Sequence, residues 1–296
     1  RSQITTGFAD AALAFIDASA RDQKPFYVNL WADDVHSPFW PPVEQWRDGK
    51  RGLYHAVLES MDRQLGKLFD RIRSDPALRD NTLILVCSDN GPEPGAGSAG
   101  PFRGAKTQLH EGGIRVPFLV SWPARIPASR TYTQPVISLD ILPTALAAAG
   151  ATRAAALAPL DGTDLLPFLT GKNDSAPHAR LFWRMDGGEA FAVREGQWKW
   201  LRTYQNAPQL FDLATDLGES RDLATARPEI AARVAKSAGN FTASKGADQL
   251  MEGKLKAQFA ESFNDAALKN IKWYPAVPAG LEAIEGRILD RIKAAN

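Results

Sequence analysis

The feature that most constrains this chain is a short apolar run that ends in oxygen-bearing side chains. Leu83 to Cys87 is an unbroken apolar run, and Ser88-Asp89-Asn90-Gly91 follows it directly. Such a run suits a strand buried on both faces of a helix-covered sheet, although a run this short is also compatible with a helix. In open α/β sheets, ligands collect at the carboxyl ends of the strands. The pattern therefore predicts a ligand site at Asp89 and Asn90, with a plain Asn-Gly turn as the alternative.

Cationic side chains follow this predicted strand end. A loop rich in Gly and Pro leads to four polar residues before Gly112-Gly113, namely Arg103, Lys106, His110 and Glu111. Carboxylate and amide oxygens are the ligands of hard divalent cations, and clustered positive charge attracts anions. The segment therefore indicates a site for a divalent cation and an anionic substrate. For Lys106 the alternative is a solvated loop lysine.

Two elements upstream are predicted to bring a histidine to the same sheet edge. Phe26 to Trp31 is aromatic and β-branched enough to predict a strand, and His36 lies in the Pro-rich loop after it. Apolar residues spaced by three and four from Tyr54 to Ile72 predict an amphipathic helix. With the Leu83–Cys87 strand these elements would form a βαβ unit, whose strand ends meet at one edge. We therefore expect His36 to lie near Asp89, with a plain surface histidine as the alternative.

The remaining predicted elements are short and local. They are a helix from about Gly7 to Ala20 capped by Thr5 or Thr6, a strand from Phe118 to Ser121, a helix ending at Gly150 with Asp140 as its cap or first-turn acid, and two strands between Phe191 and Leu201 joined at Glu195-Gly196.

Composition excludes several classes of protein. With 44% apolar and 23% charged residues, the 296-residue chain is globular rather than disordered. A net charge of +1 gives no reason to expect nucleic-acid binding. No apolar run approaches the roughly 18–20 residues that span a bilayer. Cys87 is the one cysteine, so no disulfide forms within the chain. The start, Arg1-Ser2-Gln3, is neither Met nor a signal peptide, and we expect the chain to begin inside a longer product.

The ordered set S-D-N-G, F-R-G-x-K and H-E-G-G-x-R-V-P resembles a segment of the sulfatase family, in the alkaline-phosphatase superfamily. The resemblance runs from about Thr5 to Ala226. It implies an α/β fold with an alkaline-phosphatase-like mixed sheet between helices. Residues 1–173 would be the C-terminal part of the catalytic domain, and residues 174–296 a subdomain with a small antiparallel sheet plus helices.

The resemblance also implies the roles of individual residues. Sulfatases hold Ca²⁺, less often Mg²⁺, and Asp89 and Asn90 match two of its ligands. Lys106 matches the lysine that contacts the sulfate, and His36 matches a histidine that acts as general acid toward the departing alcohol. His110 falls on the substrate side of the site. We expect Glu111 to brace the loop against Arg103 or Arg115.

The family nucleophile is a formylglycine made from Cys or Ser in a C/S-x-P-x-R segment. We expect this motif to be missing from the whole chain, and Cys87 is expected to be a small buried residue. The chain is therefore expected to be the C-terminal portion of a sulfatase, inactive without an N-terminal portion that carries the nucleophile. The substrate class would be a sulfate ester, including sulfated carbohydrate, and family resemblance suggests a periplasmic or secreted location. The alternatives are a related phosphatase or phosphonate monoester hydrolase, and a non-catalytic module that keeps the scaffold.

Overall fold

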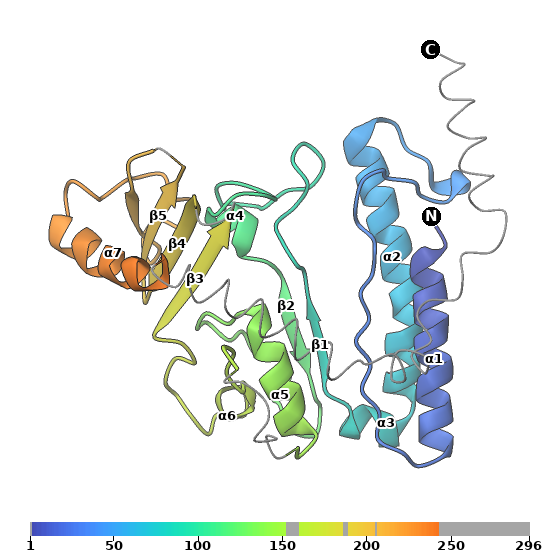
Figure 1. Ribbon diagram of the computed structural model, residues 1–296. Helices are drawn as coiled ribbons and strands as arrows, with labels where there is room; N and C mark the ends of the chain where they lie inside the picture. The colour runs from blue at the N-terminus through green and yellow to red at the C-terminus, as the bar shows by residue number, and fades with distance from the viewer. Residues whose placement is uncertain (1, 152–159, 186–188, 205, 243–296) are drawn as a thin grey trace, which may run out of the picture. The chain divides into compact units, whose positions relative to one another are not determined.

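The computed structural model describes residues 2–151, 160–185, 189–204 and 206–242 (Figure 1). The chain divides into one compact unit of residues 1–239 and a second of residues 240–296. Both sheets and the site loops belong to the first unit. Of the helices predicted for the 174–296 subdomain, those after residue 242 lie outside the described residues, and the boundary at residue 173 stays a prediction.

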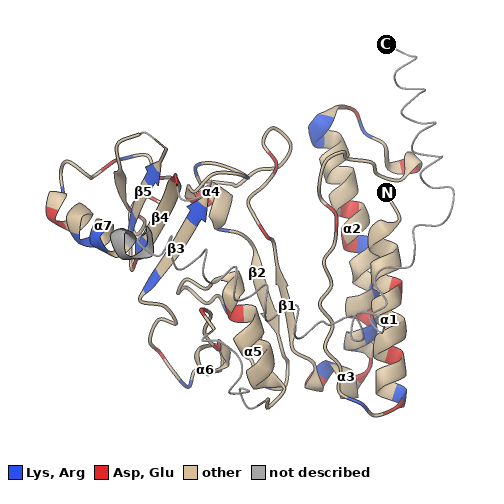
Figure 2. Cartoon of the chain, in the orientation of Figure 1, with Lys and Arg blue, Asp and Glu red and all other residues tan. Residues whose placement is uncertain are grey.

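Three helices form the N-terminal layer: α1 (Ile4–Arg21), α2 (Gly49–Ser74) and α3 (Pro76–Asn81). Their apolar faces meet in a core that contains Ile16, Leu68 and Leu78. Charged residues recur along α1 and α2 (Figure 2), and most of them are exposed, as amphipathic helices require. Both long helices were predicted, and α2 begins about one turn earlier than the pattern indicated.

The predicted cap of the first helix is wrong. The helix begins at Ile4 with Gln3 at its N-cap, so Thr5 lies inside the first turn. Thr5 is fully buried, and its hydroxyl donates to Asp34 Oδ2 at 3.1 Å. The residue therefore ties α1 to the loop before His36 instead of capping its own helix.

The prediction of a strand at Phe26–Trp31 is also wrong. This segment runs extended, and none of the described strands pairs with it. Its alternate residues Phe26, Val28 and Leu30 pack on the α1–α2 core, while Tyr27 and Trp31 are exposed. The sequence has strand propensity, but a β-strand also needs a hydrogen-bonded neighbour, which local propensity cannot supply.

β1 (Ile84–Cys87) confirms the strand predicted there, but its pairing differs from the prediction. It pairs antiparallel with β2 (Phe118–Ser121), with Cys87 opposite Phe118 and Ile84 opposite Ser121. The expected parallel βαβ unit is therefore absent from the described residues. Val86 and Leu119 are exposed, so the ribbon is not buried on both faces as expected.

Short helical elements lie in the loops between the longer helices and the strands. They are η1 (Val43–Gln45), α4 (Glu111–Ile114), η2 (Ser138–Asp140), α5 (Ile141–Ala148) and α6 (Leu166–Leu169). Asp140 is fully buried and accepts from the backbone N–H groups of Ile137 and Thr163 at 2.9 and 2.8 Å. His178 Nε2 lies 2.9 Å from the same carboxylate. Asp140 therefore occupies the N-cap position of α5 as expected, but its carboxylate binds N–H groups outside that helix.

A four-stranded antiparallel sheet follows, in the order β3 (Arg180–Met185), β4 (Ala190–Glu195), β5 (Trp198–Thr203) and β6 (Gln209–Asp212). The hairpin predicted at Glu195-Gly196 is present, and Gly196 has a positive φ of 58°, which glycine adopts at little cost. One face packs on α7 (Pro228–Thr242) through Val193 and Leu210. The other face receives the segment before α4. No described helix is long and apolar enough to cross a membrane.

Candidate active site

The S-D-N-G turn after β1 lies directly on the H-E-G-G turn at α4. Gly91 N–H donates to Gly113 O at 2.9 Å, and a Cβ at Gly91 would stand 2.0 Å from Gly112 O. Neither Asn90 nor Gly91 has a positive φ. The glycine is therefore required by close backbone approach, and the alternative of a plain positive-φ Asn-Gly turn is wrong.

Asp89 and Asn90 present oxygen ligands at the end of β1. The Asp89 side chain is exposed, and Asn90 donates a hydrogen bond from Nδ2 to it. Ser88 Oγ donates to Asn90 O at 2.9 Å and fixes the turn from within. Among the described residues, no group of three or more His, Cys, Asp or Glu side chains is arranged to hold a metal. That Asp89 and Asn90 bind a cation stays a prediction.

Lys106 is held by its own loop. Its N–H donates to Pro92 O at 3.0 Å, and its Nζ lies 4.0 Å from Glu93 Oε2. Lys50, in the first turn of α2, lies 3.1 Å from the other oxygen of Glu93. The Lys106 side chain is only 25% exposed. The ammonium of this lysine therefore lies near a carboxylate, on a side chain that is mostly buried.

His36 lies exposed on the loop between the extended segment and α2, with Nδ1 2.8 Å from Ser37 O. The loop is anchored by Phe39, which is 6% exposed and stacks edge-on against Tyr54 at 5.4 Å. Ala96, from the Gly-rich loop after β1, belongs to the same cluster. The loops of His36 and Lys106 thus both pack on the start of α2. That His36, Asp89 and Lys106 point into one cleft stays a prediction.

His110 and Glu111 face the C-terminal sheet. Burial, and then the nearby charges of Arg103 and Lys199, lower the pKa of His110 from 6.5 to about 4. The imidazole is therefore neutral at pH 7 and adds no positive charge to the site. Glu111 is 2% exposed and lies 3.5 Å from Arg115 Nη1, one of the two partners expected for it. It also lies 3.0 Å from Lys199 Nζ, a partner that was not expected.

Sequence reasoning missed two residues, Lys199 and Glu219, that contact Glu111. Both are fully buried. The Glu219 carboxylate accepts from Glu111 N–H at 2.5 Å, and Arg103 donates to Glu219 O at 3.0 Å. A signal was present, since Lys199 stands between two tryptophans on a predicted strand. A charged residue at such a position is rarely buried without a partner.

The arrangement joins oxygen ligands, a fixed lysine and a braced loop in the order of the sulfatase motifs. The sulfatase family model matches residues 2–151, half of the chain, and the model of the N-sulphoglucosamine sulphohydrolase C-terminal region matches residues 102–238. The chain belongs to the sulfatase family.

Individual relatives agree with this assignment. Arylsulfatase G of Rattus norvegicus is 31% identical over 267 residues, covering 77% of this chain and 49% of the relative. N-acetylgalactosamine-6-sulfatase of Canis lupus familiaris is 31% identical over 227 residues, covering 71% of this chain and 41% of the relative. This sulfatase chain therefore spans about half the length of the curated relatives it matches.

Solved structures show the same fold. The crystal structure of Ps i-CgsB in complex with k-i-k-neocarrahexaose has a TM-score of 0.71 and 28% identity, covering 81% of this chain and 55% of the other. The sulfatase chain thus has the alkaline-phosphatase-like α/β fold expected from its motifs.

One segment does fit the sulfatase nucleophile pattern, although the motif was expected to be missing from this chain. Ser121-Trp122-Pro123-Ala124-Arg125 has the form S-x-P-x-R. Ser121 pairs with Ile84, at the end of β1 remote from Asp89. β1 ends at Cys87, three residues or about 10 Å beyond Ile84, and Asp89 follows two residues later. Trp122 Nε1 donates to Asp80 O at 3.0 Å, and Arg125 stacks on the Trp122 ring. This segment therefore closes the β2 end and is not a nucleophile for the site at Asp89.

Proposed function

We propose that the protein containing this chain hydrolyses sulfate esters, and that the chain supplies the anion- and metal-binding half of the site. The observation that carries the proposal is the direct packing of the S-D-N-G turn on the H-E-G-G turn, which fixes Asp89–Asn90 and the Lys106 loop on one backbone support. Membership of the sulfatase family supports the reaction class.

The family implies a Ca²⁺ ion, and the donor set fits one. Ca²⁺ takes six to eight oxygen ligands from carboxylates and amide carbonyls. The exposed Asp89 carboxylate and the adjoining Asn90 amide offer such oxygens. We infer that they hold part of the coordination shell, with the remaining ligands supplied from outside this pair. The bound ion would supply positive charge next to a sulfate oxygen.

The other residues have distinct roles in the proposal. Lys106, held beside Glu93, places its ammonium against the sulfate and stabilises negative charge on the transferring group. His36, exposed on its loop, donates a proton to the departing alcohol. His110 is neutral and contributes shape and hydrogen bonding rather than charge. The formylglycine nucleophile would come from a segment outside this sequence, in a protein that we place in the periplasm or outside the cell.

Sulfated carbohydrate is the substrate class that we favour. Two similar proteins have names that concern sugars, an N-acetylgalactosamine-6-sulfatase and a protein solved with a bound neocarrahexaose. Trp40 and Trp46, on the loop after His36, are 46% and 56% exposed although the neighbouring Phe39 is buried. Exposed indoles on a fixed loop offer flat surfaces for sugar rings.

The test uses the whole protein that contains this sequence. We expect turnover of 6-sulfated N-acetylgalactosamine and of an aryl sulfate. We expect Lys106→Ala to lower kcat/KM by roughly a hundredfold or more, because it removes charge stabilisation in the transition state. Lys67→Ala, at an exposed position of α2, is the matched control and should keep full activity. The 296-residue chain alone should show no turnover.

Three results would contradict the proposal. A preference for a phosphonate monoester over every sulfate ester would favour the related hydrolases. No hydrolysis of any ester by the whole protein would favour a non-catalytic module. Turnover by the 296-residue chain alone that depends on Lys106 would mean that the nucleophile lies within this sequence.

A further inference from the structure

A charged cluster is buried between the site loop, residues 103–113, and the C-terminal sheet. Lys199, on β5, has no exposed side-chain surface. Its Nζ lies 3.0 Å from Glu111 Oε1 and 2.8 Å from Glu219 Oε1, so one ammonium joins two carboxylates. Only the contact to Glu111 is a well-directed hydrogen bond. Glu111 and Lys199 are 88 positions apart in the sequence.

Stability alone is a poor explanation for this cluster. Removing charges from water costs several kcal/mol per ion, and apolar replacements of buried ion pairs are often as stable. Burial raises the pKa of Glu219, while the charge of Lys199 opposes that shift. What an ion pair adds beyond apolar packing is direction, because it fixes the position of each partner.

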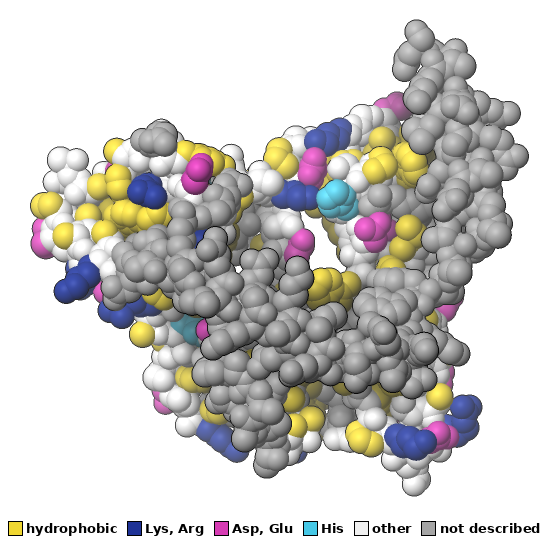
Figure 3. Space-filling model, viewed as in Figure 1, with side chains coloured by type: hydrophobic (Ala, Val, Ile, Leu, Met, Phe, Trp, Pro, Cys, Tyr) yellow, Lys and Arg dark blue, Asp and Glu magenta, His cyan; other side chains and the backbone are white. Residues whose placement is uncertain are grey.

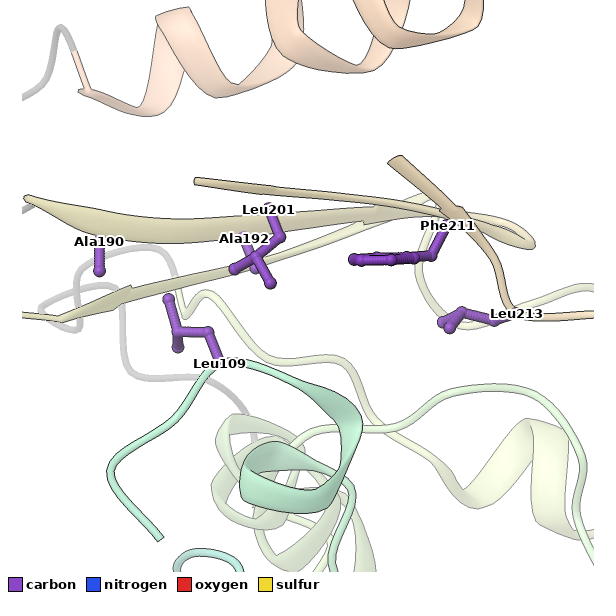
Figure 4. Close-up of a cluster of buried hydrophobic side chains, with 6 residues drawn as sticks. All are labelled: Leu109, Ala190, Ala192, Leu201, Phe211 and Leu213. Carbon is purple, nitrogen blue, oxygen red and sulfur yellow. The ribbon is translucent and has the colours of Figure 1, made fainter. Parts of the chain in front are cut away.

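Apolar contact already joins the loop to the sheet. Figure 4 shows Leu109, just before α4, pointing at the sheet face formed by Ala190, Ala192, Leu201 and Phe211. Such contact is favourable but non-directional. The ionic cluster lies two residues further along the chain, at Glu111. Its contact with Lys199 on β5 is directional and can fix the position of the loop along the sheet.

The two glycines after Glu111 connect it to the site, because their backbones contact the loops that carry Lys106 and Asp89. Gly112 N–H donates to Arg103 O at 2.7 Å, and a Cβ at Gly112 would stand 2.3 Å from Gly104 O. The backbone that leads to Lys106 therefore rests on Gly112. Gly113 O accepts from Gly91 N–H at 2.9 Å, so the Asp89–Asn90 turn rests on the same support.

We infer that Lys199 is a positioning residue of the active site. Through Glu111 it fixes the backbone support shared by Lys106 and the Asp89–Asn90 turn. The C-terminal sheet thereby fixes the position of the loop that carries the site residues of the catalytic domain. The inference rests on the proposed function for the roles of Lys106 and Asp89, but its test measures the support itself and needs no catalytic activity.

The test compares two variants of the full 296-residue chain that share one substitution. Glu219→Gln keeps the shape at that position and leaves Lys199 to bind Glu111. The double variant Lys199→Met with Glu219→Gln removes one charge of each sign, so the buried charge stays balanced. Arg115 and Arg194, at 3.5 and 3.8 Å from Glu111 Oε2, still neutralise Glu111. The double variant is therefore expected to fold.

Hydrogen exchange by NMR is the measurement. In the double variant we expect the amides of Gly91, Gly112 and Gly113 to exchange at least about tenfold faster than in Glu219→Gln, because local opening of the loop becomes easier. Amides of β4 and β5 should differ by less than about threefold between the two variants. The His110 ring signals provide a second readout, since removal of the Lys199 charge raises the pKa of His110 from about 4.

Each outcome decides the question. Loop amides that exchange equally in both variants overturn the inference, because Lys199 then does not fix the loop. Equal loosening of the loop and of β4 and β5 also overturns it, because Lys199 then serves general stability. Faster exchange confined to the loop, with the shift in the His110 titration, supports it. A whole protein that proved to hydrolyse no sulfate ester would leave this result unchanged.

Discussion

His110 has a ring nitrogen, Nε2, that is buried without a hydrogen-bond partner among the described residues. Its pKa in the folded chain is about 4, whereas the ordinary value is 6.5. As the pH falls from 6.5 to 4, the unfolded chain takes up a proton here that the folded chain does not. The contribution of this residue to the free energy of unfolding is therefore fully present above pH 6.5, and on the order of 2–3 kcal/mol is lost by pH 4.

Urea unfolding of wild type and His110→Gln between pH 4 and 7 measures this loss. We expect the free energy of unfolding of His110→Gln to fall less over that range, because the glutamine takes up no proton in either state. His36→Gln, which changes an exposed histidine, is the control and should follow wild type. Parallel curves for wild type and His110→Gln would show that this histidine is not held neutral by the fold.

At the level of elements, the turns around α4 depend on glycine because backbones touch. A Cβ at Gly91 would stand 2.0 Å from Gly112 O and 2.8 Å from Gly113 Cα. We therefore expect Gly91→Ala to lower the free energy of unfolding by about 3 kcal/mol, since rigid backbone must move to admit the methyl group. Gly66→Ala is the matched control. It lies in α2 with open space at Cβ and should raise stability by about 0.5–1 kcal/mol.

Thermal and urea unfolding distinguish these two alanines. If Gly91→Ala were as stable as wild type, the close packing of the two turns would be wrong. The inference that Asp89 and Lys106 share one backbone support would then be wrong as well.

The same elements show what the sequence predicts and what it does not. Periodicity located α1 and α2, and an unbroken apolar run located β1, because each of these signals is local to its own segment. Pairing is not local, so Phe26–Trp31 was predicted as a strand although it has no described partner. Motif order identified Lys106 and Asp89 as candidates. Their shared backbone support at Gly112 and Gly113 could not be predicted from the sequence, since it depends on backbone contacts that form only in the folded chain.

Across the whole chain, long-range charge pairing was the hardest feature to predict. Glu111 and Glu219 are 108 positions apart, yet the carboxylate of one binds the N–H of the other. Each residue looks like an ordinary surface acid in the sequence, and the prior for glutamate favours exposure. Only Lys199, placed among tryptophans, departs from its local pattern. In the sequence, a buried charge network of this kind is therefore indicated by the lysine at an apolar strand position and not by its glutamates.

Exposed apolar surface is the other property of the whole molecule with a measurable consequence. Hydrophobic side chains reach the surface in several places in the view of Figure 3. Tyr27 and Trp31 are 60% and 77% exposed on one side of the extended segment, whose backbone pairs with no described strand. An unpaired, apolar, extended segment is a template for association with another chain. We therefore expect the 296-residue chain to bind hydrophobic dyes and to associate as its concentration rises.

Light scattering and dye fluorescence test this expectation with two single variants, each of which adds one lysine at a different position. Trp31→Lys puts a cation on the extended segment, where it opposes edge pairing, and should lower both signals. Leu139→Lys puts the same charge at a leucine on η2 that is 54% exposed and lies outside the Phe26–Trp31 segment. A single exposed leucine is ordinary surface, so this control should leave both signals near those of wild type. If the two variants lowered association equally, added charge alone would explain the effect, and the extended segment would not be the surface through which the chains associate.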